Sequence, residues 1–157
     1  MIIDLERGEI LESVFKLDYE FAVPDLLFEE ELKPYGGDRL LELGLRVEEL
    51  DGTGVGQAIQ QRRETPSLSM PDAFALTLAR ENDWVLLTGD GPLRMLAGAQ
   101  KVECHGVLWV FDELEAAALL EAEALHRSLS RISAHERCRL PKTEVNVRLK
   151  RYRNPVR

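Results

Sequence analysis

The chain has 157 residues, of which 45% are hydrophobic and 31% are charged, and its formal net charge is −8. That length fits one ordinary domain, which can bury enough apolar surface to fold without a disulfide framework or a structural metal. Only two cysteines are present, Cys104 and Cys138, so we expect a reducing, cytoplasmic location. No apolar run approaches the roughly 20 residues of a membrane helix, and no signal peptide opens the chain, so we expect no membrane partner.

The hydrophobic spacing predicts strands that alternate with helices, after a short apolar start at residues 1–4. Predicted helices cover residues 8–17, 25–32, 69–80, 112–132 and 142–153, a segment that follows a glycine-rich loop at 52–56 and ends near residue 63, and a segment after the turn at 89–92. Predicted strands cover residues 21–23, 45–47, 84–88 and 107–110. In this reading Asp112 caps the long helix that ends near residue 132. Such alternation predicts a parallel α/β sheet with helices on both faces.

The charge is divided unevenly along the chain. Residues 137–157, the basic arm, contain eight basic residues and one acid and carry +7, whereas residues 1–136 carry −15. Residues 142–153 fit a short amphipathic basic helix that packs on the domain or on a second copy. The arm is interpreted either as a solvated surface or as a contact for phosphates or an acidic partner surface.

Four carboxylates follow predicted strands or begin predicted helices. Asp90 follows the strand at 84–88, Asp72 begins the helix before that strand, Glu31 ends the helix after the first strand, and Asp4 follows the apolar start. Ligands of open parallel sheets bind beyond the carboxyl ends of the strands, so these acids are expected to converge. Converging carboxylates repel one another, and Mg²⁺ or Mn²⁺ relieves that repulsion. The pattern therefore indicates metal binding or phosphodiester hydrolysis.

Each of these acids also has a structural interpretation. The residues from Ser69 to Asp72 match the S-x-x-D capping box, and Asp90 before Gly-Pro fits a helix N-cap. Glu31 belongs to a run of three glutamates, which is typical of a solvated face, and Asp4 can begin a turn. Both interpretations stay open for each residue.

Several segments resemble a known family. Residues 68–76 (LSMPDAFAL) and 85–94 (VLLTGDGPLR) resemble the core of a PIN domain, a family that includes the VapC-like toxin ribonucleases of bacterial toxin–antitoxin pairs. Residues 23–32 (VPDLLFEEEL) resemble the family's second block, and residues 102–110 (VECHGVLWV) resemble its last strand region.

The resemblance implies a fold and an activity. It covers roughly residues 1–114 and implies a three-layer α/β/α sandwich with a central parallel sheet. We expect the PIN-like domain to span residues 1–125, followed by a basic C-terminal helical extension at residues 126–157. It also implies a ribonuclease that uses Mg²⁺ or Mn²⁺ and whose partners are RNA, a cognate antitoxin and a second copy in a homodimer. The residues expected to take part are Asp72, Asp90, Glu31 and Asp4 as catalytic and metal-binding acids, Thr88 and Arg94 as supporting residues, and Arg148, Lys150, Arg151 and Arg153 as nucleic-acid contacts.

The chain departs from the family pattern at its start. Residues 1–8 resemble the end of the family's first block, which would place the first catalytic aspartate and its central strand upstream of Met1. Either the start is misassigned or truncated, or Asp4 serves in a shortened site, or the site is incomplete. A missing central strand would expose the sheet interior and call for a partner chain.

Two other function classes are compatible with the sequence. A non-catalytic PIN-like module would bind a protein or RNA through the basic arm. A receiver-like or phosphatase-like α/β domain fits less well, because paired N-terminal acids and a lysine at a strand end are missing from the pattern.

Overall fold

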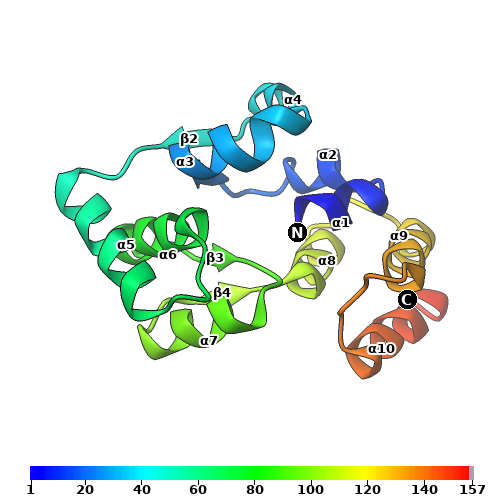
Figure 1. Cartoon of the computed structure of the whole chain (residues 1–157). Helices are drawn as coiled ribbons and strands as arrows, with labels where there is room; N and C mark the ends of the chain where they lie inside the picture. The colour runs from blue at the N-terminus through cyan, green and yellow to red at the C-terminus, as the bar shows by residue number, and fades with distance from the viewer. Residues whose placement is uncertain (156–157) are drawn as a thin grey trace. The chain divides into compact units, whose positions relative to one another are not determined.

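The computed structural model describes residues 1–155 and divides the chain into two compact units (Figure 1). Unit 1 contains Met1–Tyr19 and His105–Arg157, and unit 2 contains Glu20–Cys104. Arg157, the last residue of the predicted basic arm, lies outside the described residues. Within the described part, no helix has both the length and the apolar character that a membrane span requires.

Unit 2 contains short parallel strands embedded among helices. Its elements are β1 (Ala22–Pro24), α3 (Asp25–Leu27), a π-helical turn η1 (Phe28–Leu32), a 3₁₀ turn η2 (Lys33–Tyr35), α4 (Gly37–Glu42), β2 (Arg46–Glu48), α5 (Gly52–Glu64), α6 (Met70–Asn82), β3 (Leu86–Leu87), α7 (Gly91–Ala99) and β4 (Cys104–His105), which crosses into unit 1. The strands predicted at 21–23, 45–47 and 84–88 are thus confirmed in place, although they are short. The helices predicted at 25–32 and 69–80, after 92 and up to about residue 63 are also present. The loop predicted at 52–56 is wrong, because α5 begins at Gly52, where Asp51 caps it by accepting a hydrogen bond from the Gly54 backbone N–H.

The strands form two separate pairs rather than one sheet in the described residues. β1 and β2 pair in parallel, with Val23 opposite Val47, and β3 pairs with β4. The predicted central parallel sheet is therefore represented by two two-stranded sheets. Each strand has only two or three residues, so its ladder is too short to present a broad face to covering helices.

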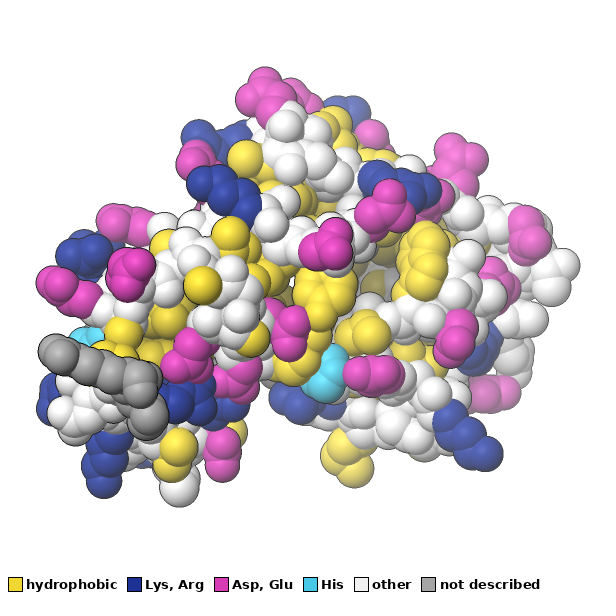
Figure 2. Space-filling model, turned by 180° about the vertical axis from the view of Figure 1, so that it is seen from behind, with side chains coloured by type: hydrophobic (Ala, Val, Ile, Leu, Met, Phe, Trp, Pro, Cys, Tyr) yellow, Lys and Arg dark blue, Asp and Glu magenta, His cyan; other side chains and the backbone are white. Residues whose placement is uncertain are grey.

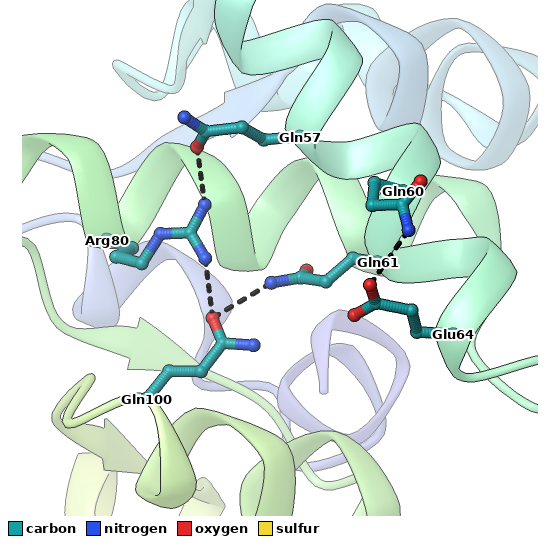
Figure 3. Close-up of a pocket in the computed structure, with 6 residues that line it drawn as sticks. All are labelled: Gln57, Gln60, Gln61, Glu64, Arg80 and Gln100. Carbon is teal, nitrogen blue, oxygen red and sulfur yellow. Dashed lines mark hydrogen bonds between the residues drawn. The ribbon is translucent and has the colours of Figure 1, made fainter.

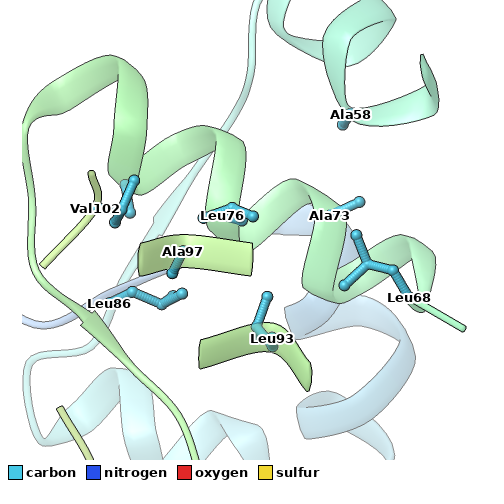
Figure 4. Close-up of a cluster of buried hydrophobic side chains, with 9 residues drawn as sticks. Ala58, Leu68, Ala73, Leu76, Leu86, Leu93, Ala97 and Val102 are labelled. Atoms are coloured by element: carbon cyan, nitrogen blue, oxygen red, sulfur yellow. The ribbon is translucent and has the colours of Figure 1, made fainter. Parts of the chain in front are cut away.

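Helix α6 organises the core of unit 2. It contacts α5, α3, α7, β1 and β3, and its buried face packs into an apolar cluster (Figure 4). The buried members of that cluster are Ala58, Leu68, Ala73, Leu76, Ala79, Leu86, Leu93, Ala97 and Val102. The helix begins where the Ser69 hydroxyl accepts a hydrogen bond from the Asp72 backbone N–H at 3.1 Å, as a capping residue should. The core thereby fixes both ends of α6 within the unit.

Unit 1 is helical in its described part. It contains α1 (Ile2–Arg7), α2 (Leu11–Val14), α8 (Val107–Ala116), α9 (Ala122–Ala134) and α10 (Lys142–Arg153). Helix α9 contacts α1, α8 and α10, and the predicted basic helix at 142–153 is confirmed as α10. The helix predicted at 8–17 is shorter than expected, because only α2 forms there. The predicted domain boundary between residues 125 and 126 falls within α9 and stays a prediction.

The strand predicted at residues 107–110 is wrong, because this segment begins α8. Val107, Val110, Phe111 and Leu114 are each 2% exposed or less. Their spacing of three and four residues is the period of one helix face, whereas a strand would bury alternate residues. The apolar run at 107–110 therefore has the period of a helix and not the two-residue period of a strand.

The long helix predicted from Asp112 to residue 132 is also wrong. Asp112 lies inside α8 and does not cap a helix, and residues 117–121 separate α8 from α9. Ala118 takes a left-handed backbone conformation with φ of 51°, which interrupts helical hydrogen bonding just after α8.

Candidate active site

Glu31 and Asp72 form an acidic pair in unit 2. Glu31 is exposed, but partial burial of its carboxyl raises the pKa, and the negative charges of Asp72 and Glu30 raise that pKa further. Glu31 lies in the π-helical turn η1, and α3, which leads into that turn, contacts α6. Two carboxylates that raise a pKa in this way are close enough to repel, and a cation between them would remove that cost.

The Asp72 carboxylate does not take part in the cap of α6. Its residue lies in the first turn of α6 and is half-buried, but only its backbone N–H takes part in the cap with Ser69. In the described part of the chain, neither the Asp72 nor the Glu31 carboxylate makes a hydrogen bond or ion pair. The capping-box interpretation is therefore confirmed for the backbone of Asp72, and its side chain stays available to a ligand.

Asp90 is confirmed as the N-cap of α7. Its Oδ2 accepts a hydrogen bond from the Leu93 backbone N–H at 2.8 Å. The Thr88 hydroxyl oxygen accepts one from the Asp90 backbone N–H at 3.1 Å, which holds the turn after β3. The residue is exposed, so its second carboxylate oxygen faces solvent at the positive end of the α7 dipole. Thr88 therefore shapes the turn that holds Asp90, and its role in a catalytic site stays a prediction.

Arg94 is an exposed cation one turn into α7. Its backbone N–H donates to the Asp90 carbonyl at 3.0 Å, so both residues share the first turn of that helix. Burial raises the pKa of the Cys104 thiol, and the charge of Arg94 opposes that rise. Cys104 and Cys138 are both free thiols. Arg94 thus supplies positive charge on the same helix that Asp90 caps.

Asp4 belongs to unit 1 and has partners there. It lies within α1, where its Oδ1 accepts a hydrogen bond from Arg7 Nη1 at 3.1 Å. Its other oxygen lies 3.9 Å from the amino group of Met1. The segment is helical, so Asp4 does not follow a strand, and the observed role of its carboxylate is local pairing within α1.

The donor set fits an open divalent site rather than a closed cage. Among residues 1–155, no three or more histidine, cysteine, aspartate or glutamate side chains come together as a metal-binding group, and the predicted set of four carboxylates stays a prediction. Mg²⁺ is commonly bound by one or two carboxylates together with waters and substrate phosphates. The free oxygens of Glu31 and Asp72 meet that requirement, and repulsion between them is what such an ion relieves.

The sequence analysis missed the contribution of Glu30 and of the π-helical turn. Glu30 adds to the negative field at Glu31, and the signal for it was the run of three glutamates. π-Helical turns are uncommon and often occur at functional sites. The hydrophobic spacing of the sequence does not distinguish the π-helical turn η1 from an α-helical one.

Most of the cations predicted to contact nucleic acid have partners within unit 1. Arg148 pairs with Asp112, Arg151 pairs with Asp112 and Glu115, and Arg153 Nε donates to His126. Lys150 is exposed and has no ion pair within the described part of the chain.

The visible surface mixes the two signs of charge. Figure 2 shows Lys and Arg side chains interspersed with Asp and Glu, without a continuous basic area on that face. Among the four cations that the sequence suggested, Lys150 is the one that is exposed and whose side chain makes no ion pair or hydrogen bond with the described residues, so a phosphate contact would rely on it first.

Comparison with known families gives one result. A family model described as a PIN domain matches residues 1–154, which covers nearly the whole chain. No curated protein and no solved structure matches.

Proposed function

This chain belongs to the PIN-domain family, a group with a nuclease-type fold, and we propose on that premise that it is a metal-dependent endoribonuclease. The reaction is hydrolysis of an RNA phosphodiester bond. The observation that carries the proposal is the acidic pair of Glu31 and Asp72, whose carboxylates make no ion pair with a cation among residues 1–155. The three-layer sandwich, the choice of Mg²⁺ or Mn²⁺ and a cytoplasmic location belong to the same proposal.

Glu31 and Asp72 would hold the divalent ion, and Asp90 would add its free oxygen from the start of α7. When bound, the ion stabilises negative charge that develops on the phosphoryl group. The raised pKa of Glu31 reflects the burial and repulsion that an ion held by the pair would offset. Arg94 would attract the neighbouring phosphate to the same helix end.

The test is RNA cleavage by Asp72→Asn and Asp90→Asn with Mg²⁺ or Mn²⁺. Asparagine caps helices about as well as aspartate, so Asp90→Asn keeps α7 intact while it removes the charge. Asp38→Asn is the matched control, because Asp38 is an exposed acid on α4 in the same unit. We expect cleavage to fall at least about 100-fold in both site variants and to be unchanged in the control. Full cleavage by both site variants would exclude the proposed site.

Direct ion binding gives a second readout that does not depend on activity. Mn²⁺ titrated into the full chain should broaden the carboxyl and backbone NMR signals of Glu31 and Asp72 before those of Asp38. Broadening at Asp38 but not at the pair would place the ion elsewhere.

A toxin role adds two partners to this proposal. The second partner after RNA would be an antitoxin protein, and the chain itself would form a homodimer. Equilibrium ultracentrifugation of the full chain tests the homodimer, which a monomer at all concentrations would exclude. Growth arrest on expression, relieved by Asp90→Asn, tests the toxin role.

The alternative function is a non-catalytic module that binds RNA or a protein through the basic arm. It is favoured by the observation that the described residues contain no group of three or more side chains that could hold a metal ion. Removal of the whole arm is a poor test, because Val145 and Tyr152 of α10 are buried. Lys150→Glu changes an exposed charge instead, and unchanged RNA binding in that variant would count against the alternative.

A further inference from the structure

A polar hollow of about 460 Å³ lies in unit 2 beside the C-terminal parts of α5 and α6 and the end of α7 (Figure 3). Its lining consists of Gln57, Gln60, Gln61, Glu64, Arg80 and Gln100. These four glutamines are all the glutamines that the 157-residue chain contains. Glutamines that only solvate helix surfaces would be scattered over the chain, whereas here they converge from two helices on one place.

The hydrogen bonds of the hollow fix which way its amides point. Arg80 donates from Nη1 to Gln100 Oε1 at 2.8 Å and from Nη2 to Gln57 Oε1 at 2.6 Å. A guanidinium group can only donate, so Gln100 must present its carbonyl oxygen to Arg80. Gln61 Nε2 then donates to that same Gln100 oxygen at 2.8 Å. A reversed Gln61 amide would place its own oxygen against the Gln100 oxygen, and two acceptors cannot hydrogen-bond to each other.

This arrangement leaves the Gln61 carbonyl oxygen without a donor. The residue is 7% exposed, and its Oε1 is buried with no hydrogen-bond partner. A buried acceptor is normally satisfied, and an unsatisfied one marks a place where something else can donate to it. Because bulk water is excluded there, a hydrogen bond made to that oxygen is stronger than one at the surface.

A second hollow of about 370 Å³ adjoins the first, and Arg80 and Gln100 line both. It adds Trp84, whose side chain is 39% exposed although it is large and aromatic. Asp83 and Lys101 also line it, and both take positive φ values, 55° and 59°, directly after the ends of α6 and α7. The negative ends of two helix dipoles therefore lie beside this hollow, which disfavours a phosphate there and favours N–H donors.

We infer that the two adjoining hollows bind one nucleobase. The amides of Gln57 and Gln100 offer donors to the edge of a base, in the manner of glutamine contacts to adenine. A small rotation of the Gln61 side chain would present its unsatisfied, buried oxygen to the same edge as an acceptor. The indole of Trp84 offers an aromatic face, on which unpaired bases stack regardless of sequence. The inference deepens the ribonuclease proposal, on which it rests for the source of the base, and it gives the enzyme a base-recognition subsite.

The acceptor character of the hollow predicts which bases bind. Gln61 Oε1, the Glu64 carboxylate and the helix ends all accept hydrogen bonds, so a base with an exocyclic amino group is favoured. Adenosine, guanosine and cytidine carry that group, and uridine does not. We expect uridine to bind weakest of the four.

The test is an NMR titration of the full chain, without divalent metal, with each of the four nucleosides and with inorganic phosphate. Saturable shifts are expected for the four glutamine side-chain amides and the Trp84 indole. The Asn146 and Asn154 amides and the Trp109 indole, which lie in unit 1, serve as internal controls and should stay in place. No shift at millimolar nucleoside, equal shifts in the controls, or the same shifts with phosphate alone would overturn the inference.

Variants separate stacking from edge recognition. Trp84→Ala should weaken nucleoside binding roughly five- to 100-fold, as loss of a stacking face does, and Gln57→Ala roughly two- to tenfold. Arg63→Ala, an exposed residue of α5 outside the lining, should leave affinity unchanged. Unchanged affinity in both Trp84→Ala and Gln57→Ala would refute the subsite.

The two proposals fail independently. Nucleosides contain no phosphodiester bond and the titration contains no metal, so binding does not depend on catalysis. A chain that binds nucleosides but cleaves no RNA would refute only the nuclease, and a nuclease that ignores nucleosides would refute only the subsite.

Discussion

Replacement of Asp112 by asparagine should detach the basic helix α10 from α8. The Asp112 Oδ1 accepts hydrogen bonds from Arg148 Nε at 2.9 Å and from Arg151 Nη2 at 2.8 Å, and its Oδ2 accepts one from Arg148 Nη2 at 2.5 Å. One carboxylate therefore makes a bidentate contact with one arginine and a single contact with another. Such charge-assisted bonds are the stronger class of protein hydrogen bonds.

The expected loss of unfolding free energy in Asp112→Asn lies between the loss for an exposed ion pair and the loss for a buried ion pair. The side chain of Arg148 is only 14% exposed, whereas those of Asp112 and Arg151 are 35% and 40% exposed. Exposed pairs contribute about 0.2–1 kcal/mol, and removal of one partner of a buried pair costs about 3–5 kcal/mol. We therefore expect Asp112→Asn to lower the free energy of unfolding by about 2 kcal/mol.

Urea denaturation at pH 7, followed by circular dichroism, measures this loss. Glu144→Gln is the matched control, because Glu144 also pairs with Arg148 but its side chain is 57% exposed, and it should cost less than about 0.5 kcal/mol. A double-mutant cycle of Asp112→Asn with Arg148→Met isolates the coupling between the two residues. A loss below about 0.5 kcal/mol for Asp112→Asn, or a coupling of zero, would refute the reasoning.

The pH dependence of stability gives an independent check. Burial alone would raise the Asp112 pKa, but the hydrogen bonds and charges of Arg148 and Arg151 outweigh it and lower that pKa below 3.8. A lowered carboxyl pKa contributes stability that is complete well above pH 3.8 and is lost as the pH falls through the lowered value. Wild type should therefore lose more stability than Asp112→Asn in this acidic range, and parallel profiles would contradict the network.

Four further predictions concern unit 2 and the core of unit 1. Gly37→Ala should destabilise by about 1–3 kcal/mol in urea melts, because its Cβ would lie 2.8 Å from the Leu32 carbonyl carbon. Gly56→Ala, with nothing within 4 Å, should stabilise α5 by about 0.5–1 kcal/mol, and destabilisation there would contradict the open surroundings. Phe111→Ala should cost about 3–5 kcal/mol, since Phe111 is fully buried, and a loss below 1 kcal/mol would refute its core position. Asp72→Asn should lower the pKa of Glu31, measured by carboxyl NMR, and an unchanged pKa would show that the two acids are apart.

Helix boundaries were predictable where the sequence carries local chemistry. Ser69 and Asp90 cap α6 and α7, as the S-x-x-D and Thr-Gly-Asp-Gly-Pro patterns indicated. α8 was not predicted because the run from Val107 to Phe111 is apolar at every position, and such a run is compatible with a buried strand or a buried helix. Only the spacing from Val110 and Phe111 to Leu114 distinguishes a helix from a strand here. Leu114 lies in the segment predicted as the next helix, so this spacing did not count toward the run.

The candidate site was predictable in its residues but not in its assembly. Asp72 and Asp90 were identified from helix starts, whereas the approach of Glu31 to Asp72 depends on packing between η1, α3 and α6. That packing joins segments about 40 residues apart, which no local pattern encodes. The glutamine-lined hollow had a partial signal, because Gln57, Gln60 and Gln61 have the spacing of one helix face.

Helix α6 carries residues of both proposed sites, the acidic pair and the base-recognition subsite. Asp72 lies in its first turn and Arg80 lies in its last turns, eight residues further on. A helix rises 1.5 Å per residue, so about 12 Å of axis separates the acidic pair from the base-recognition subsite. Because the helix fixes this separation, RNA would be cleaved at a constant distance from the recognised base. One added turn of α6 would displace the cleavage position along the RNA without altering either chemistry.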